Sequence, residues 1–357
     1  MRASSVVKFN PSARTRVAME LPPDRAAEVI KRPDPLRRLI PIPYSTNLSC
    51  MGKCVRLETN DPAILEHLVD LFSIYPPSRE QPVLFRWRII SEALPEGTPF
   101  SLARFAFSDS QLRYAEFGQH NFIAIDIDSR LAVVLVSEKL ARDRSSLTYP
   151  FLDTLFCMCA ASLGFTSLFA NCIEVGGKAV LLLGLPRSGK TALSYLAAKR
   201  GMRWHADDGV FLENNDGTLQ AWGGFWPALM REETLDFFPE IRTLAKSFYY
   251  GDFAFRRLDR CSRGFQSLHP PVEPRCCVFL NRNAGEQVRV TRLPLQYFRK
   301  RLVESLLFEE DLHFERQQNE VLELLTELPA YDISHAGDPA PVMSAISSLD
   351  TSSTDTA

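Results

Sequence analysis

The sequence predicts a mixed protein, α+β in one part and α/β in the other: a core around a mixed central sheet, preceded by a small β-rich α+β domain. Three observations support this. Short β-rich runs separated by turn residues recur between about 50 and 137, with one helical stretch at about 61–73. An apolar strand, a glycine-rich loop and a helix follow one another at 178–200. Strands and helices then succeed one another from 276 to 334, as they do when helices cover a central sheet.

The chain divides into four predicted segments. Residues 1–45 are proline-rich and aperiodic, and the first 40 residues hold nine Lys and Arg against four Asp and Glu, so we expect a disordered basic arm. Residues 46–148 are expected to form the N-terminal α+β domain, and residues 149–335 the core domain. The tail, 336–357, has three acidic residues, no basic ones and many Ser, Thr, Pro and Ala, which predicts disorder.

Composition narrows the class of protein. The 357 residues carry a net charge of −2, so no basic field predicts binding to nucleic acid. The eight cysteines show no CxxC pair and no zinc-type spacing with histidine, which predicts reduced thiols and a cytoplasmic location. We find no secretory signal, and no apolar run reaches the roughly 18 residues that span a membrane. The nearest case, 151–170, predicts a buried helix.

The motif with the most specific chemistry is GLPRSGKT at 184–191, which matches the phosphate-binding (P-loop) pattern G-x-x-x-x-G-K-[ST]. Glycines let backbone N–H groups converge on phosphate oxygens, and the N-terminus of the following helix adds positive potential. Lys190 is expected to neutralise the β- and γ-phosphates, and Thr191 to ligate Mg²⁺. The predicted nucleotide-binding residues are Gly184, Leu185, Pro186, Arg187, Ser188, Gly189, Lys190 and Thr191.

The loop leaves two matters open. Arg187 is expected either to offer its charge to a phosphate or to point into solvent. The PRSG stretch also resembles the sulfonate-donor loop of sulfotransferases. In those proteins no lysine occupies the position of Lys190, so Lys190 argues against a sulfotransferase.

Two adjacent carboxylates follow the loop. Asp207 and Asp208 end the short β-like run RWHA. A carboxylate at a strand end near a phosphate loop ligates Mg²⁺ or activates a nucleophile. Because neighbouring side chains of a strand point to opposite faces, we expect only one of the pair to face a γ-phosphate unless the backbone kinks.

The stretch GLPRSGKTALSYLAAKRGMRWHADDGV (184–210) resembles the HPr kinase/phosphorylase superfamily, and more closely its divergent bacterial members, which are described as serine kinases. It has that family's order of loop, helix, Lys-Arg-Gly turn, short strand and Asp-Asp pair, with Gly209 between the acids and Val210. The resemblance is strong over about 170–225. It implies an HPr kinase-like P-loop core for 149–335.

The resemblance also implies roles. Asp208 corresponds to the general base that takes the proton of an acceptor hydroxyl, and Asp207 would assist with metal or geometry. The implied activity is an ATP-dependent kinase that transfers the γ-phosphate to a Ser/Thr hydroxyl of a protein, peptide or small-molecule acceptor, with ATP and Mg²⁺ as cofactors. The catalytic residues would be Asp208, Lys190 and Asp207, and the metal ligands Thr191 and Asp207. Homo-oligomerisation stays open.

Two departures from the family pattern bear on activity. The histidine that HPr enzymes carry before the loop corresponds here to Phe169, and its neighbours Ala170 and Asn171 do not replace it. The downstream glycine-rich signature with its metal glutamate has no clear match. We therefore do not expect HPr itself as the acceptor. A nucleotide-binding module without transfer activity stays as the alternative, ahead of a sulfotransferase-like enzyme.

Other polar and aromatic residues have ordinary structural interpretations. His205 is expected to be an exposed strand histidine. The aromatic residues Trp222, Phe225 and Trp226 are expected to pack in the interior. Four arginines are expected in a solvated loop, with a contact between one of them and the γ-phosphate as the alternative: Arg256, Arg257, Arg260 and Arg263.

Overall fold

The structure is a computed structural model, and the chain divides into two units, Met1–Pro41 and Ile42–Ala357. It describes residues 40–78, 82–93, 104–107, 111–118, 120–250, 253–259, 270–283, 287–307 and 314–349. The predicted basic arm therefore lies almost wholly outside the described residues. The predicted boundary between residues 148 and 149 falls inside the second unit and stays a prediction.

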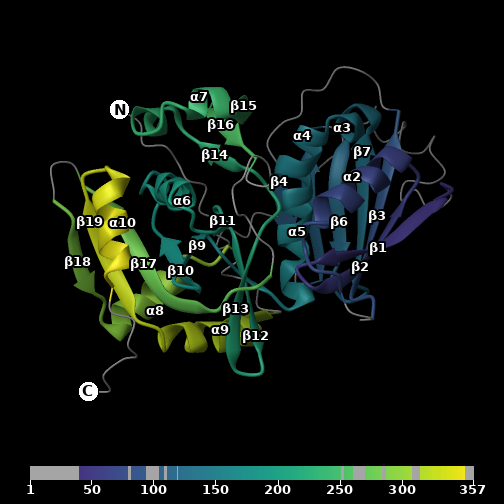
Figure 1. Cartoon of the computed structure of the whole chain (residues 1–357). Helices are drawn as coiled ribbons and strands as arrows, with labels where there is room; N and C mark the ends of the chain where they lie inside the picture. Colours follow the sequence, from purple (N-terminus) through teal and green to yellow (C-terminus); the bar gives the residue numbers. More distant parts are fainter. Residues whose placement is uncertain are drawn as a thin grey trace, which may run out of the picture. The chain divides into compact units, whose positions relative to one another are not determined.

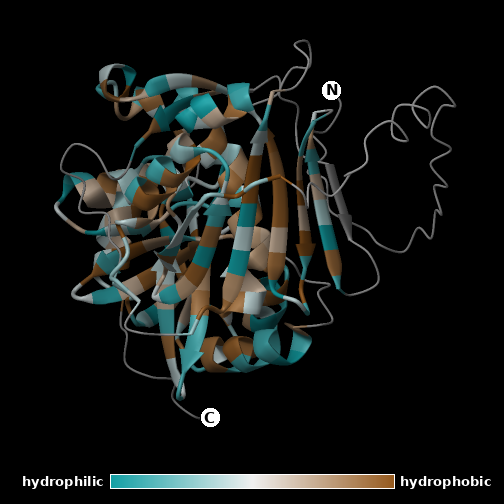
Figure 2. Cartoon of the chain, turned by 90° about the vertical axis from the view of Figure 1, so that its right-hand side faces the viewer, coloured by the Kyte–Doolittle hydropathy of each residue, from teal (hydrophilic) through white to brown (hydrophobic). Residues whose placement is uncertain are grey.

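The N-terminal part of the second unit is a seven-stranded mixed sheet with the strand order β1-β2-β3-β7-β6-β5-β4. Neighbours are antiparallel except that β3 pairs in parallel with β2 and β7. Figure 2 looks towards this sheet and shows hydrophobic and hydrophilic bands along its strands, as expected for a pleated sheet with one buried face. The strands are β1 (Tyr44–Cys50), β2 (Lys53–Thr59), β3 (Phe85–Glu92), β4 (Arg104–Phe107), β5 (Leu112–Phe117), β6 (Asn121–Asp126) and β7 (Leu131–Ser137).

Helices pack against one face of this sheet (Figure 1). The first of them begins as predicted, because Asp61 accepts a hydrogen bond from the Ala63 N–H and Pro62 occupies the first turn. In the described residues, the helical stretch Arg144–Leu163 is long and apolar enough to cross a membrane, but 67% of its apolar window is buried inside the structure. The segments are α2 (Pro62–Phe72), α3 (Glu138–Arg142), α4 (Arg144–Ser146), a π-helical turn (Leu147–Leu152), α5 (Asp153–Ala160) and a 3₁₀ turn (Ala161–Leu163).

The central sheet has six strands in the order β11-β9-β10-β17-β19-β18. Its three middle strands, β10, β17 and β19, are parallel, so their carboxyl ends share one edge. The outer strands are antiparallel to their neighbours, which makes the sheet mixed as predicted. The strands are β9 (Asn171–Val175), β10 (Lys178–Leu183), β11 (Trp204–Ala206), β17 (Pro274–Arg282), β18 (Arg289–Arg292) and β19 (Ala330–His335).

Helices cover both faces of the central sheet: α6 (Lys190–Lys199), α8 (Leu295–Val303), α9 (Glu315–Thr326) and α10 (Pro339–Ser347). In β10, Val180 and Leu182 lie in one hydrophobic cluster with residues of α6 and α10. Leu181 and Leu183 lie in another with residues of α8 and α9. The sequence of β10 is an unbroken apolar run from Ala179 to Leu183 because both faces of the strand are buried. Burial of each such side chain contributes about 1.5–3 kcal/mol.

Two three-stranded sheets complete the fold, in the orders β13-β12-β8 and β14-β16-β15. The region 228–274, where the sequence analysis assigns no strand, contains three of these strands. Their bounds are β8 (Thr166–Leu168), β12 (Val210–Asn215), β13 (Thr218–Gly223), β14 (Ala228–Met230), β15 (Lys246–Tyr250) and β16 (Phe253–Leu258), with a 3₁₀ turn (Glu232–Asp236) and α7 (Ile241–Leu244) between them.

Two of the four arginines predicted for a solvated loop lie in the sheet formed by β14, β16 and β15. Arg256 and Arg257 belong to β16, so the loop prediction is wrong for both. Arg256 pairs with Glu232 at 2.8 Å, and Arg257 donates to the Ser145 carbonyl at 3.0 Å. Contacts of this kind hold them in the fold. Arg260 and Arg263 lie outside the described residues.

The predicted disorder of the tail is corrected over residues 339–347, which form α10. Asp338 caps this helix by accepting from the Ala340 N–H, and Pro339 occupies its first turn. Val342, Met343 and Ile346 are buried against the central sheet. The tail is rich in small polar residues, but these three apolar side chains at helical spacing give it a buried face.

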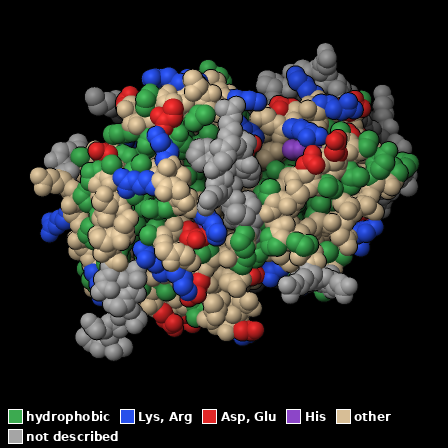
Figure 3. Space-filling model, viewed as in Figure 1, with side chains coloured by type: hydrophobic (Ala, Val, Ile, Leu, Met, Phe, Trp, Pro, Cys, Tyr) green, Lys and Arg blue, Asp and Glu red, His purple; other side chains and the backbone are tan. Residues whose placement is uncertain are grey.

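Thiols and surface charge agree with the composition. The seven cysteines among the described residues are free: Cys50, Cys54, Cys157, Cys159, Cys172, Cys276 and Cys277. On the face shown in Figure 3, Lys and Arg side chains are interspersed with Asp and Glu, as the net charge of −2 leads us to expect.

Candidate functional site

The loop 184–189 lies at the carboxyl edge of the central sheet, between β10 and α6. Gly184 and Gly189 have φ of 140° and 97°, values that side chains with a Cβ rarely adopt. A Cβ at Gly184 would also lie 2.6 Å from the Leu280 carbonyl oxygen of β17. The two glycines of the motif are thus required by the backbone path, independently of any ligand.

Lys190 begins α6 and points back into the loop. Its ammonium donates to the carbonyl oxygens of Gly184 at 2.9 Å and Leu185 at 3.3 Å, and only 4% of its side chain is exposed. Burial lowers the pKa of Lys190, while the negative charges of Asp208 and Asp207 raise it. The loop carbonyls therefore hold a buried cation at the carboxyl edge of the central sheet.

The two aspartates follow β11 and have different environments. Asp207 is buried. Asp208 has φ of 54°, so the backbone kinks, and its carboxylate lies 4.0 Å from the Lys190 ammonium with 48% of its side chain exposed. Desolvation raises the pKa of Asp208 even though its side chain is half exposed, and the charges of Lys190 and Arg231 oppose this. The kink thus turns Asp208 towards the loop lysine.

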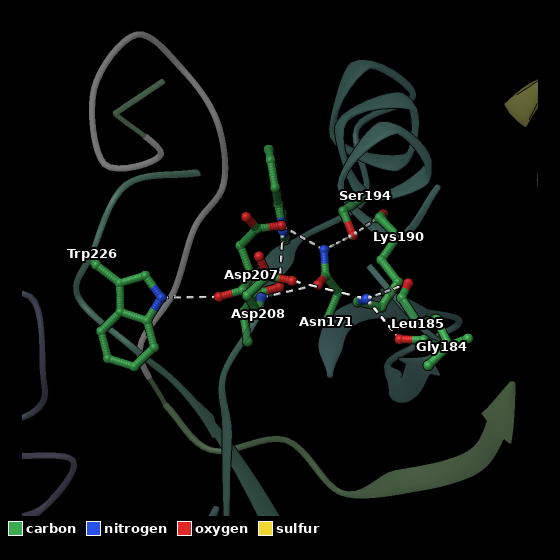
Figure 4. Close-up of polar contacts among 10 residues, drawn as sticks. Asn171, Gly184, Leu185, Lys190, Ser194, Asp207, Asp208 and Trp226 are labelled. Atoms are coloured by element: carbon green, nitrogen blue, oxygen red, sulfur yellow. Dashed lines mark hydrogen bonds and ion pairs between the residues drawn. The ribbon is translucent and has the colours of Figure 1, made fainter. Parts of the chain in front are cut away.

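Asn171, the first residue of β9, joins these parts (Figure 4). Its amide nitrogen donates to the Asp207 carboxylate and, at 3.0 Å, to the Ser194 hydroxyl of α6. Its amide oxygen accepts the Asp208 N–H at 2.9 Å. Sequence reasoning missed this role, because it depends on contacts with residues 23 and 36 or more positions away.

Trp226 fixes the aspartate turn from the other side. Its indole N–H donates to the Asp207 carbonyl at 2.9 Å (Figure 4). The ring packs on Gly209, where a Cβ would lie 2.5 Å from a ring carbon. Trp222, Phe225 and Trp226 are buried, which confirms their interpretation as packing residues.

His205 does not have the exposed position expected of it. It is buried, and its Nε2 lies 3.0 Å from a Glu174 carboxylate oxygen. This partner lies three residues along β9 from Asn171, which contacts the two aspartates that follow β11. The structure places His205 with Glu174, Lys178 and Arg203 around a small polar pocket of about 210 Å³.

Phe169 and Arg187, which the sequence analysis singled out, lie close to or in the loop. The Phe169 ring centroid lies 4.4 Å from the Lys190 ammonium, a cation–π contact. Arg187 is exposed and has φ of 73°, an unusual value for a residue with a Cβ.

Asp153 of α5 lies near enough to Asp208 for the two charges to interact, and burial raises the pKa of Asp153 to about 7.

The carboxylates do not form a self-contained metal site. Among the described residues, no group of three or more His, Cys, Asp and Glu side chains could hold a metal ion. Mg²⁺ in nucleotide sites needs only one or two protein oxygens, since phosphates and water supply the rest. Thr191, in the first turn of α6, and the buried Asp207 offer a hydroxyl and a carboxylate, and their role as Mg²⁺ ligands stays a prediction.

Comparison with known proteins leaves the family open. No protein-family model matches the chain, and no curated protein matches its sequence. Among solved structures, the chain is similar to the Hpr(Ser) kinase/phosphatase from Coxiella burnetii, with a TM-score of 0.26 and 12% identity over 51% of this chain and 92% of that chain. A TM-score of this size does not establish a shared fold, so the proposals below rest on the geometry of the site.

Proposed function

We propose that the chain is an ATP-dependent kinase that transfers the γ-phosphate to a Ser/Thr hydroxyl of a protein, peptide or small-molecule acceptor. The observation that supports it most is the meeting of Lys190 and Asp208 beside a glycine loop, with an ammonium and a half-exposed carboxylate 4.0 Å apart. A cation for the phosphates and a base for the hydroxyl are the two groups that phosphoryl transfer requires of the protein.

The proposed step uses few side chains. Backbone N–H groups of the loop and the start of α6 hold the phosphates. The Lys190 ammonium replaces its hydrogen bonds to the loop carbonyls with hydrogen bonds to phosphate oxygens. Asp208 takes the proton of the acceptor hydroxyl. The hydroxyl oxygen then bonds to the γ-phosphorus as the bond to the β–γ bridging oxygen breaks, and ADP leaves. Most of the rate enhancement comes from position and charge.

Magnesium is proposed to be held by Thr191 and Asp207. The ion would supply charge neutralisation at the β- and γ-phosphates. The hydrogen bond from Asn171 orients the Asp207 carboxylate, as hydrogen bonds from neighbouring residues commonly orient metal ligands.

Nucleotide titration tests the first half of the proposal. Isothermal titration of the full chain with ATP and Mg²⁺ should give one site, and Lys190→Ala should weaken it by about a hundredfold or more, the order expected for a buried charged hydrogen-bonding group. Lys139→Ala, an exposed lysine of α3, is the control and should bind as the wild type does. Equal affinities for the wild type and Lys190→Ala would contradict the proposal.

A nucleotide-binding module without transfer activity is the second candidate, and Phe169 favours it. This apolar ring stands against Lys190 where HPr enzymes carry a histidine, and it offers no proton. Such a module would bind ATP as above but transfer no labelled phosphate to any hydroxyl. A sulfotransferase-like enzyme would instead prefer a sulfonated adenosine bisphosphate to ATP in a competition titration.

A cytoplasmic location and an acceptor other than nucleic acid complete the proposal. The free thiols of the described residues fit a reducing compartment. Acceptor class is tested by incubating the chain with labelled ATP and separate pools of peptides, proteins and small alcohols.

A further inference from the structure

His335 ties the far strand of the parallel trio to the phosphate loop. It is the last residue of β19, which is separated from β10 by β17. Its imidazole is buried, and its Nε2 lies 2.9 Å from the carbonyl oxygen of Ser188. A Cβ on Gly189 would lie 3.3 Å from the ring, so the imidazole packs directly on the second glycine of the motif.

The hydrogen bond determines which nitrogen of His335 carries the proton. A carbonyl oxygen only accepts, so Nε2 must be the donor. Nδ1 is buried and has no hydrogen-bond partner among the described residues. Burial and the nearby Arg282 lower the pKa of His335, while the bond to Ser188 raises it. The ring is therefore a neutral imidazole with one proton, directed at the loop.

Other contacts hold the first half of the loop. The Ser188 N–H donates to the Leu185 carbonyl at 3.1 Å, and the Lys190 ammonium donates to the Gly184 and Leu185 carbonyls. The Ser188 carbonyl is held instead by a side chain 147 residues away in the sequence. The orientation of the Ser188–Gly189 peptide thus depends on a contact made between elements, not within the loop.

We infer that His335 is a positioning residue for phosphate binding: it holds the Ser188 carbonyl on one side so that the Gly189 N–H points to the other, towards the bound phosphates. The reason is the planar trans peptide, in which the C=O and the following N–H point in opposite directions. A rotated peptide would present a carbonyl oxygen, which repels phosphate, in place of a donor. The inference rests on the proposed function, because it assigns the N–H to a phosphate.

Two variants separate this role from simple packing. His335→Ala removes the donor, and His335→Gln restores an N–H donor on a side chain of another shape. His67→Ala is the matched control, since His67 of α2 is also buried and its Nε2 lies 2.9 Å from the hydroxyl of Thr148 in the π-helical turn. Thermal unfolding of all three variants identifies any general loss of stability.

Two readouts are compared on the full chain. The first is the rate of tryptic cleavage after the exposed Arg187, followed by mass spectrometry without nucleotide. The second is the affinity for sodium triphosphate and for ATP with Mg²⁺, by calorimetry. We expect His335→Ala to raise the cleavage rate and lower both affinities by about tenfold, the effect of one lost hydrogen bond to the loop. His335→Gln should recover most of both, and His67→Ala should change neither.

The outcomes that contradict the proposals differ. A wild type that binds neither triphosphate nor ATP contradicts the proposed function and this inference with it. A wild type that binds both, with His335→Ala equal to it in affinity and in cleavage, contradicts the role of His335 alone. Losses in His335→Ala that His335→Gln does not recover would also overturn it, because a packing role needs no donor.

Discussion

Replacement of Asn171 by alanine should disturb the site more than its distance from any phosphate suggests. This fully buried amide makes three hydrogen bonds: to the Asp207 carboxylate, to the Ser194 hydroxyl and from the Asp208 N–H. Alanine keeps the strand but leaves all three partners without the amide. Because Asp208 has a left-handed backbone, the bond to its N–H helps hold the kink that turns its carboxylate to Lys190.

The expected loss of stability follows from those bonds. At about 1 kcal/mol for each bond, Asn171→Ala should lower the free energy of unfolding by about 3 kcal/mol. The phosphoryl-transfer rate should fall further than nucleotide affinity, since Lys190 keeps its loop contacts. If the misplaced base raises the activation free energy of transfer by about 1.4 kcal/mol, the rate falls about tenfold.

Urea titration and transfer from labelled ATP measure the two effects. The control is Asn121→Ala, in the N-terminal sheet, where the amide accepts from the Ser137 N–H and donates to the Phe117 carbonyl. That variant should lose about 2 kcal/mol of stability and keep its transfer rate. If Asn171→Ala lost stability but transferred phosphate at the wild-type rate, the amide would be a packing element and our reasoning about Asp208 would be wrong.

Three other changes test neighbouring parts of the structure. Gly209→Ala should push Trp226 off the aspartate turn and cost about 1–3 kcal/mol, measured by urea titration, since its Cβ would meet the indole at 2.5 Å; an unchanged midpoint would refute the close approach. Asp153 has a folded pKa of about 7 against an ordinary 3.8, so its contribution to stability is full below pH 3.8 and is lost as pH rises towards 7. Asp153→Asn should therefore gain stability relative to the wild type between pH 5 and 7.5, and a gap that does not vary with pH would contradict the burial of this carboxyl. Arg187→Gly should change the free energy of unfolding by less than about 1 kcal/mol, because relief of the strained φ of 73° offsets the added freedom of the unfolded chain. If the Arg187 guanidinium contacts phosphate, the same variant should bind ATP more weakly in low-salt calorimetry.

The parts of the fold that the sequence predicts well are those specified locally. The run VLLL, the glycines after it and the helix-forming residues behind them give β10, the loop and α6 from their own composition. The α10 helix was not predicted, because only tertiary packing reveals three apolar side chains among small polar ones as a buried face. The strands of 228–258 were missed for a similar reason: short strands depend on their partners.

Much the same holds for the site. The loop and the aspartate pair could be named from the sequence since each is a short motif with its own chemistry. Asn171 and His335 could not, because their roles exist only through contacts with residues 36 and 147 positions away. His205 was misjudged for the same reason, since its partner, Glu174, lies on a neighbouring strand.

The most direct test of the central claim is the rate of γ-phosphate transfer by Asp208→Asn compared with its ability to bind ATP. Asp216→Asn is the matched control, an exposed aspartate whose φ of 51° equals that of Asp208 within a few degrees. We predict that Asp208→Asn binds ATP with Mg²⁺ about as tightly as the wild type but transfers phosphate at least about a hundredfold more slowly, the contribution typical of a general base. Transfer by Asp208→Asn at the rate of the wild type and of Asp216→Asn would contradict the account.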